Sequence, residues 1–102
     1  MIAELNIYAN ERGVVIIPEI DMPAHAYSWW KSFPDIVSCP DMLSPSTVVG
    51  QLDPRIDKTY TITQQVLDDV IALFPQSPII HLGFDEALYY CWGVTRTQAL
   101  QM

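Results

Sequence analysis

Two short runs of aliphatic residues constrain the fold of this chain more than any other feature of its sequence. The first is Val14–Ile17 and the second is Ile79–Gly83. Neither run shows the alternation of polar and apolar residues that a half-exposed strand has, so each is typical of a parallel strand covered on both faces. We therefore expect an α/β protein with a parallel sheet, in which helices connect consecutive strands.

Apolar residues at helical spacing predict two helices around these runs. Ile2–Ala9 repeats apolar residues at steps of three and four, and Gly13 follows as a left-handed helix stop. A second helix is predicted from a cap at Asp57 or Thr59 through Phe74. Its apolar stripe comprises Tyr60, Thr63, Val66, Leu67, Val70, Ile71 and Phe74.

The predicted elements do not close around a core. Their order is helix, strand, long loop, helix, strand and the start of a helix at Val94–Met102. Two parallel strands that are buried on both faces need neighbouring strands, and nothing else in the chain supplies them. We expect the chain to be an incomplete segment of a larger barrel or sheet, which on its own would expose apolar faces and associate.

Polar side chains gather where the two predicted strands end. In parallel α/β folds, ligands bind at the carboxyl ends of the strands. The irregular Glu19–Pro54 stretch, with its short helical turns expected within Ala24–Lys31, is long enough that we expect it to build a site. The polar residues are Glu19, Asp21 and His25 after the first strand, and His81, Asp85 and Glu86 on or after the second.

Structural interpretations compete with catalytic ones at these positions. An isolated Asp85–Glu86 pair is more often a solvated helix N-terminus. Its place after a buried strand, together with a second polar cluster, favours a site in which one carboxyl group is held protonated and the other ionised. His25 alone would more often be structural, and for His81, inside the strand, we favour the structural role.

The charge of the chain excludes some partners. Five Lys and Arg against twelve Asp and Glu give a net charge of −7, and the basic residues form no run. A nucleic acid is therefore not an expected partner. The longest apolar runs are far shorter than the roughly 20 residues that a membrane span needs, so we expect no membrane span.

Two separated motifs resemble those of one known family. The first is Ile-Pro-Glu-Ile-Asp-Met-Pro-Ala-His-Ala at Ile17–Ala26, and the second is His-Leu-Gly-Phe-Asp-Glu at His81–Glu86. They are similar to the strand-three and strand-four signatures of family 20 glycoside hydrolases, the β-N-acetylhexosaminidases. The resemblance continues through Tyr8–Gly13, Leu52–Pro54, Phe74–Pro75 and Cys91–Trp92.

The resemblance implies a fold and a reaction. Residues 1–102 would be part of a (β/α)8 TIM-barrel catalytic domain, from the end of helix two through strand three to the start of helix four. The complete enzyme would hydrolyse terminal N-acetyl-D-hexosamine residues from β-linked glycans, with retention of configuration. In this family the substrate's own acetamido oxygen attacks the anomeric carbon, which departs from the scheme of two catalytic carboxylates. The segment alone is expected to be inactive.

The same resemblance implies residue roles. Glu86 would be the general acid and then the base, and Asp85 would orient the acetamido group and stabilise the charge that grows on it. His25 and Asp21 would support the acid through hydrogen bonds, and Trp92 would either line the sugar pocket or lie in the core. No metal or cofactor is implied.

The chain departs from the family pattern at two positions. Gly83-Phe84 stands where the family has a pair of glycines, and Pro23-Ala24-His25 stands where it has Pro-Gly-His. If the backbone at Phe84 needs a positive φ, the phenylalanine is strained there. These departures leave room for an altered specificity or a weakened site.

The resemblance also implies a Cys39–Cys91 disulfide, because members from eukaryotes join such positions, with two free buried thiols as the alternative. A disulfide would indicate an oxidising compartment, lysosomal or secreted. The resemblance also allows a homo- or heterodimer in the complete enzyme.

Two other functions stay open. Asp21, His25, His81, Asp85 and Glu86 are all residue types that bind divalent metals, so a metal-dependent hydrolase is one alternative. A non-catalytic sugar-binding segment is the other, and Phe84 favours it.

Overall fold

The structure is a computed structural model, and it describes residues 1–42 and 49–101. Its element order is α1 (Ile2–Asn10), β1 (Glu19–Met22), β2 (Val37–Ser38), β3 (Gln51–Leu52), α2 (Asp57–Leu73), β4 (His81–Gly83) and α3 (Arg96–Ala99). Single 3-10 helices, Tyr27–Lys31 and Tyr89–Trp92, follow β1 and β4. Residues 43–48 of the predicted long loop and Met102 of the last predicted helix lie outside the described residues.

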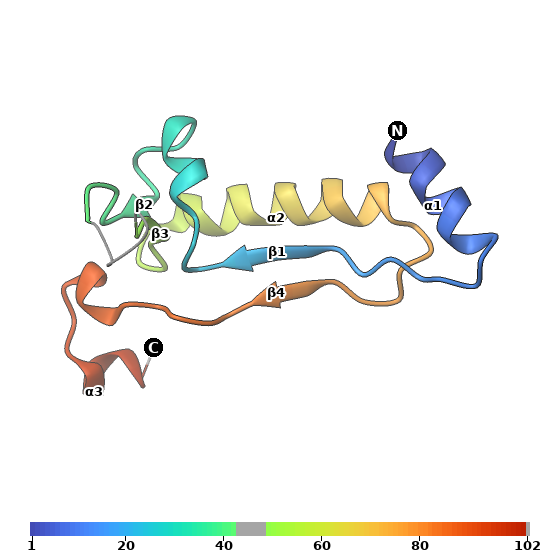
Figure 1. The fold of residues 1–102 in the computed structure, drawn as a ribbon. Coiled ribbons are helices and arrows are strands. Elements are labelled where there is room, and N and C mark those ends of the chain that lie inside the picture. Colours follow the sequence, from blue (N-terminus) through green and yellow to red (C-terminus); the bar gives the residue numbers. More distant parts are fainter. Residues whose placement is uncertain (43–48, 102) are drawn as a thin grey trace.

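The parallel pair expected from the sequence is present. β1 and β4 pair in parallel, with Glu19 opposite His81 and Met22 opposite Gly83. Three steps along β1 match two steps along β4, so a bulge lies within β1, around Ile20 and Asp21. In Figure 1 the two strands run side by side in the same direction, and α2 lies along them as the crossover between them.

The predicted strand at Val14–Ile17 is wrong, because the residues that pair are Glu19–Met22. Pro18, expected to close the strand, instead precedes it, and its carbonyl accepts a hydrogen bond from the His81 amide at 2.9 Å. An apolar run forms a regular central strand only where strands flank it on both sides. Among the described residues β1 has only β4 beside it, and Val14 and Val15 stay half exposed.

Both predicted long helices are present, with differences at their ends. α1 ends before Gly13, whose φ is 67°, as the sequence predicts. Neither Asp57 nor Thr59 caps α2: the N-cap is Ile56, and its side chain offers no capping hydrogen bond. Asp57 is instead the first residue of the helix, where its negative charge interacts favourably with the positive end of the helix dipole.

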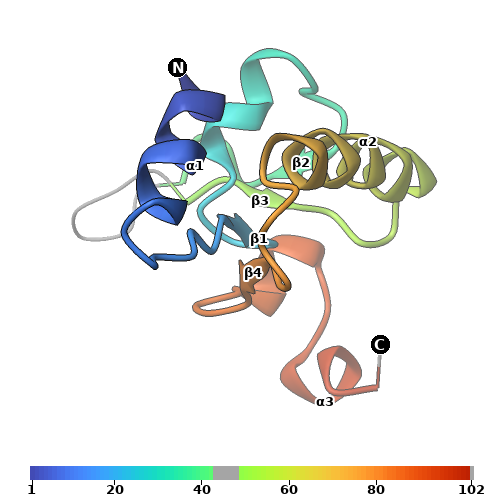
Figure 2. The same ribbon diagram turned by 90° about the vertical axis from the view of Figure 1, so that its right-hand side faces the viewer.

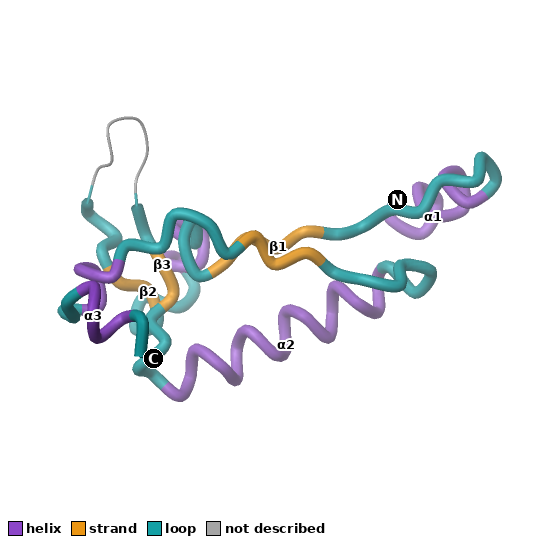
Figure 3. The backbone as a smooth tube through the Cα atoms, turned by 90° about the horizontal axis from the view of Figure 1, so that it is seen from below, coloured by secondary structure: helices purple, strands orange, loops and turns teal. Residues whose placement is uncertain are grey.

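The predicted apolar stripe of α2 is only partly buried. Leu67 of the stripe packs against the core, whereas Tyr60 and Ile71 are more than half exposed. Ile62, which the sequence did not assign to the stripe, also packs against the core. In Figure 3 the β1–β4 pair is shorter than α2, so these strands do not cover the helix along its whole length.

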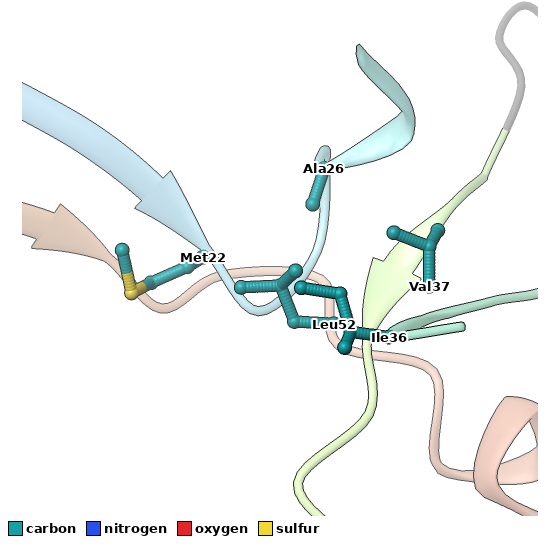
Figure 4. Close-up of a cluster of buried hydrophobic side chains, with 5 residues drawn as sticks. All are labelled: Met22, Ala26, Ile36, Val37 and Leu52. Atoms are coloured by element: carbon teal, nitrogen blue, oxygen red, sulfur yellow. The ribbon is translucent and has the colours of Figure 1, made fainter. Parts of the chain in front are cut away.

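A β2–β3 hairpin that the sequence did not predict forms the core with the end of β1. β2 and β3 pair antiparallel, with Val37 opposite Leu52 and Ser38 opposite Gln51. The buried cluster in Figure 4 lies between this hairpin and the segment after β1, and consists of Met22, Ala26, Ile36, Val37 and Leu52.

The molecule is elongated. Its principal extents are 49 × 30 × 27 Å and its radius of gyration is 16.0 Å, against about 13 Å for a compact chain of this length. Figures 1 and 2 show α1 at one end of the strands, and the hairpin and α3 at the other. Among the described residues, none of the helices combines the length and the apolar character that crossing a membrane requires.

Candidate active site

A line of three side chains joins the ends of the two parallel strands. Asp21 lies in β1, His25 follows β1, and Glu86 follows β4. Nδ1 of His25 lies 2.5 Å from Oδ2 of Asp21, and Nε2 lies 3.1 Å from Oε2 of Glu86. The imidazole thus bridges a carboxylate of one strand to a carboxylate beyond the other, as expected from the convergence of strand ends.

The line runs from the sheet toward solvent. The Asp21 side chain is 29% exposed, His25 is 42% exposed and Glu86 is 76% exposed. An inner carboxylate therefore holds the imidazole, and the outer carboxylate is free to meet a ligand.

Asp85 lies close to the same line. One carboxylate oxygen from each of Asp21 and Asp85 and one ring nitrogen of His25 lie within 4.8 Å of one another. These three atoms are types that a divalent cation accepts as ligands. The arrangement therefore has two chemical interpretations, a proton-transfer site at Glu86 and a metal site at Asp21, His25 and Asp85.

The carboxylates raise the pKa of His25 above its ordinary value. The largest cause is the hydrogen bond to Asp21, burial opposes it, and Glu86 and the charge of Asp85 add to it. A cationic imidazole donates from both ring nitrogens, so it can hold Asp21 and Glu86 at once. The raised pKa widens the pH range in which this double hydrogen bond exists.

Strained backbone surrounds the site. His25, Phe84 and Glu86 have positive φ angles of 55°, 69° and 53°. Such angles are uncommon for residues other than glycine and cluster at functional sites. The strain foreseen for a phenylalanine at position 84 is therefore real, and its side chain is 66% exposed.

Ala24, the second departure from the family pattern, is accommodated without such strain. It is buried, and its φ is not positive.

Gly83 allows Asp21 to take its position. A Cβ added to Gly83 would overlap Oδ1 of Asp21, and the φ of Gly83 is +69°. Oδ1 of Asp21 is buried without a hydrogen-bond partner among the described residues. The glycine of β4 therefore makes room for the carboxylate of β1.

Two residues of the predicted polar clusters lie outside this line. Glu19 and His81 face each other across β1 and β4, with Nδ1 of His81 3.3 Å from Oε2 of Glu19, and both side chains are more than half exposed. Nδ1 of His81 also accepts from the Gly83 amide at 3.2 Å. These contacts agree with the structural role favoured for His81.

The segment after β4 is anchored to the hairpin. The structure contains the Cys39–Cys91 disulfide implied by the resemblance, with Cα atoms 5.6 Å apart. The Trp92 indole is buried, and its N–H donates to the Leu52 carbonyl at 3.0 Å. Trp92 therefore anchors the segment here, and its contact with a sugar stays a prediction.

Sequence reasoning missed a buried polar network in the hairpin. Asp53, only 3% exposed, accepts hydrogen bonds from Arg55 and Ser38. The Arg55 guanidinium lowers the pKa of Asp53 to about 2, and it also donates to the Trp92 carbonyl. Gln51, which is fully buried, hydrogen-bonds to the backbone of Leu88. The resemblance at Leu52–Pro54 was a signal for Asp53, but nothing in the sequence singled out Gln51.

The chain is similar to known proteins over nearly all its length. Residues 1–102 match the model of "Glycosyl hydrolase family 20, catalytic domain". The chain is 35% identical over 87 residues to beta-hexosaminidase subunit beta of Mus musculus, a match that covers 84% of this chain and 16% of that protein. It is 40% identical over 97 residues to beta-hexosaminidase of Emericella nidulans, which covers 84% of this chain and 16% of that protein.

A solved structure agrees with these matches. The X-ray structure of Flavobacterium johnsoniae chitobiase superposes with a TM-score of 0.76 at 31% identity, covering 98% of this chain and 16% of that one. This chain therefore spans 16% of the length of each of the three relatives.

Proposed function

Because the chain belongs to glycosyl hydrolase family 20, we propose that it supplies the acid-bearing part of the active site of a β-N-acetylhexosaminidase. The complete protein would hydrolyse terminal non-reducing N-acetyl-D-hexosamine residues from β-linked glycans. The observation that carries this proposal is the exposed Glu86 carboxylate, which lies beyond the carboxyl end of β4 with His25 at 3.1 Å and Asp85 beside it in the chain.

We infer that the chain is one segment of a (β/α)8 barrel. In that assignment β1 is strand three, α2 is helix three, β4 is strand four, and α3 begins helix four. The parallel β1–β4 pair with α2 as its crossover supports this order. The TM-score of 0.76 with the chitobiase supports it as well.

Glu86 is the general acid of the proposed reaction. As the substrate's acetamido oxygen attacks the anomeric carbon, the bond to the leaving oxygen breaks and Glu86 gives its proton to that oxygen. The product of this step is a cyclic oxazolinium ion. Water then attacks the anomeric carbon, Glu86 takes a proton from the water, and the configuration is retained.

Asp85 acts on the acetamido group. Its carboxylate accepts a hydrogen bond from the acetamido N–H, orients the oxygen for attack, and stabilises the positive charge that develops there. The exposure of Asp85 and its closeness to the Asp21–His25 pair support a place at the mouth of the site.

His25 and Asp21 position the acid. A protonated His25 donates from Nδ1 to the Asp21 carboxylate and from Nε2 to a carboxyl oxygen of Glu86, and Asp21 fixes the ring from inside. Because the pKa of His25 is raised, this arrangement is complete at acidic pH and loses one hydrogen bond as the pH rises through that pKa. We therefore expect activity to fall on the alkaline side.

The proposed setting follows from the disulfide. Disulfides persist in oxidising compartments, so the Cys39–Cys91 bridge is consistent with one. We propose a lysosomal or secreted protein that binds β-linked N-acetylhexosamine glycans and, in its complete form, assembles as a homo- or heterodimer.

A metal-dependent hydrolase is the second candidate, because Asp21, His25 and Asp85 place three potential ligand atoms within 4.8 Å of one another. In that case the cation would activate water, and Glu86 would only assist. The two candidates predict opposite responses to chelation.

The test uses the complete natural protein that contains this segment. An aryl N-acetyl-β-glucosaminide that releases a chromophore reports turnover after exhaustive removal of metals. We expect turnover to persist, and Glu86→Gln to lower kcat by about 100- to 10,000-fold. Loss of activity that Zn²⁺ restores would support the metal enzyme instead. Unchanged turnover by Glu86→Gln would contradict the assigned acid.

A further inference from the structure

The Gln51 side chain makes a fork of two hydrogen bonds to one residue of the segment that carries Glu86. Its Nε2 donates to the Leu88 carbonyl at 3.0 Å, and its Oε1 accepts from the Leu88 amide at 2.9 Å. Gln51 is 0% exposed, so no water competes for either bond. We propose that Gln51 is a positioning residue that holds the Glu86 backbone in place for catalysis. This inference rests on the proposed function of Glu86.

The segment after β4 depends on this fork. Its last hydrogen bond to the sheet runs from the Phe84 amide to the Met22 carbonyl at 3.1 Å. Among the described residues, the next backbone amide to be bonded is that of Leu88. Residues 85–87 therefore span between two fixed points, and Gln51 holds the second.

Strain at Glu86 makes the second fixed point necessary. The φ of Glu86 is 53°, a left-handed conformation that is unfavourable for a residue other than glycine. Such a backbone persists only where its surroundings impose it. A segment released at Leu88 would relax toward negative φ and swing the Glu86 carboxylate away from Nε2 of His25.

The other anchors of this segment lie farther from Glu86. The disulfide acts at Cys91 and the indole hydrogen bond at Trp92, whereas the Gln51 fork acts two residues after Glu86. The fork is also built into the hairpin, because Gln51 lies in β3 and pairs there with Ser38 of β2. Gln51 therefore transmits the rigidity of the hairpin to the catalytic acid.

Two substitutions in the complete protein test this role. Gln51→Leu removes both hydrogen bonds but keeps a buried side chain of similar size. We expect kcat to fall about 100-fold, the usual consequence of a small misplacement of a catalytic group. KM should change less than about twofold, because Gln51 does not touch the substrate.

Gln51→Glu tests the role through the pH dependence of kcat, which would not change if Gln51 only filled space in the core. A protonated carboxyl group copies the amide, since its O–H donates to the Leu88 carbonyl and its C=O accepts from the Leu88 amide. An ionised carboxylate cannot donate and repels that carbonyl. We expect kcat of this variant to be near the wild-type value at low pH. As the pH rises, kcat of the variant should fall at a lower pH than kcat of the wild type does.

Thr59→Val is the matched control. It removes a buried hydrogen bond, from Thr59 Oγ1 to the Asp53 carbonyl, without contacting Leu88. We expect a lower melting temperature and an unchanged kcat. Equal losses of kcat in Gln51→Leu and Thr59→Val, or a pH profile of Gln51→Glu that matches wild type, would overturn the positioning role. Should Gln51→Leu fail to fold, the Gln51→Glu profile alone decides.

The Glu86→Gln variant distinguishes a failure of the positioning role of Gln51 from a failure of the proposed function of Glu86. If Glu86→Gln abolishes turnover but the Gln51 variants stay fully active, only the positioning role is wrong. If Glu86→Gln turns over normally, the proposed function is wrong and the role of Gln51 is wrong with it.

Discussion

The two ends of the molecule differ in how well they are covered. At the carboxyl ends of β1 and β4, the hairpin, the disulfide and the Asp53–Arg55 pair enclose a buried cluster beneath the Asp21–His25–Glu86 line. At the opposite end, where Figure 1 shows α1, Val14 and Val15 are each 55% exposed. Ala9 is the one buried residue that α1 contributes among the described residues.

The difference indicates which interactions this segment makes by itself. The site end forms its buried cluster, its disulfide and most of its polar contacts between residues of this segment, although Oδ1 of Asp21 has no partner among the described residues and Phe84 is 66% exposed. The other end presents aliphatic surface of the kind that another layer of a barrel covers. We propose that the remainder of the complete protein covers it, since relatives are several times longer.

The largest expected effect comes from Gly83→Ala at the site end. An alanine at position 83 would have an unfavourable φ, and its Cβ would overlap the Asp21 side chain. Asp21 would have to move, and His25, which is hydrogen-bonded to it, would move as well. We expect the free energy of unfolding of the complete protein to fall by about 2–5 kcal/mol, together with most of kcat.

Gly13→Ala is its control at the opposite end. Gly13 has nearly the same φ, +67°, but an added Cβ meets nothing within 4 Å. Only the backbone cost of about 1–2 kcal/mol should appear in urea unfolding, with kcat unchanged. Equal effects of the two substitutions would contradict the difference between the ends.

Removal of the disulfide should have the next largest effect. Cys39→Ser together with Cys91→Ser releases a loop with a sequence separation of 52 residues. We expect a loss of about 2–4 kcal/mol in the free energy of unfolding. Calorimetry of the complete protein with and without a reductant measures it, and a wild-type transition unmoved by reductant would contradict the anchoring role.

Asp53→Asn should lower the free energy of unfolding by about 2 kcal/mol near pH 6, because it removes the contribution of the buried carboxylate, whose pKa is lowered in the folded state. A lowered pKa stabilises the folded state above the unfolded-state value of 3.8, and this contribution is lost as the pH falls through about 2. The difference between wild type and variant in urea unfolding should therefore stay constant from pH 6 to 4.5 and shrink below. A difference that grew with falling pH would contradict this sign.

Val15→Thr should have the smallest effect, about 1 kcal/mol in the complete protein, from burying a hydroxyl group. Val37→Thr, in the hairpin core, is the comparison. If Val15→Thr left the free energy of unfolding unchanged while Val37→Thr lowered it, the α1 end would be exposed in the complete protein too.

Much of the site was predictable because strand order brings it together. Asp21, His25, Asp85 and Glu86 follow two aliphatic runs, and parallel strands bring their carboxyl ends to one edge. The position of β1 was not predictable from the run alone, since Val14–Ile17 lacks the flanking strands that would order it. Each strand of the hairpin has two residues, too few for a periodic pattern.

The role of Gln51 shows a second limit of sequence reasoning. Its partner is the backbone of Leu88, 37 residues away in the chain. Every residue except proline has both a backbone N–H and a carbonyl, so no residue type signals such a contact. Only the folded arrangement of the hairpin against the segment after β4 reveals it.

Participation of the substrate's acetamido group is the central claim, and one measurement tests it directly. The complete protein, freed of metals, is assayed with aryl β-glucosaminides that carry either an N-acetyl or an N-trifluoroacetyl group. Fluorine withdraws electrons from the attacking oxygen, so the account predicts a large fall in kcat for the fluorinated substrate. Equal kcat values would show that this oxygen does not attack the anomeric carbon, and would contradict the roles assigned to Asp85 and Glu86.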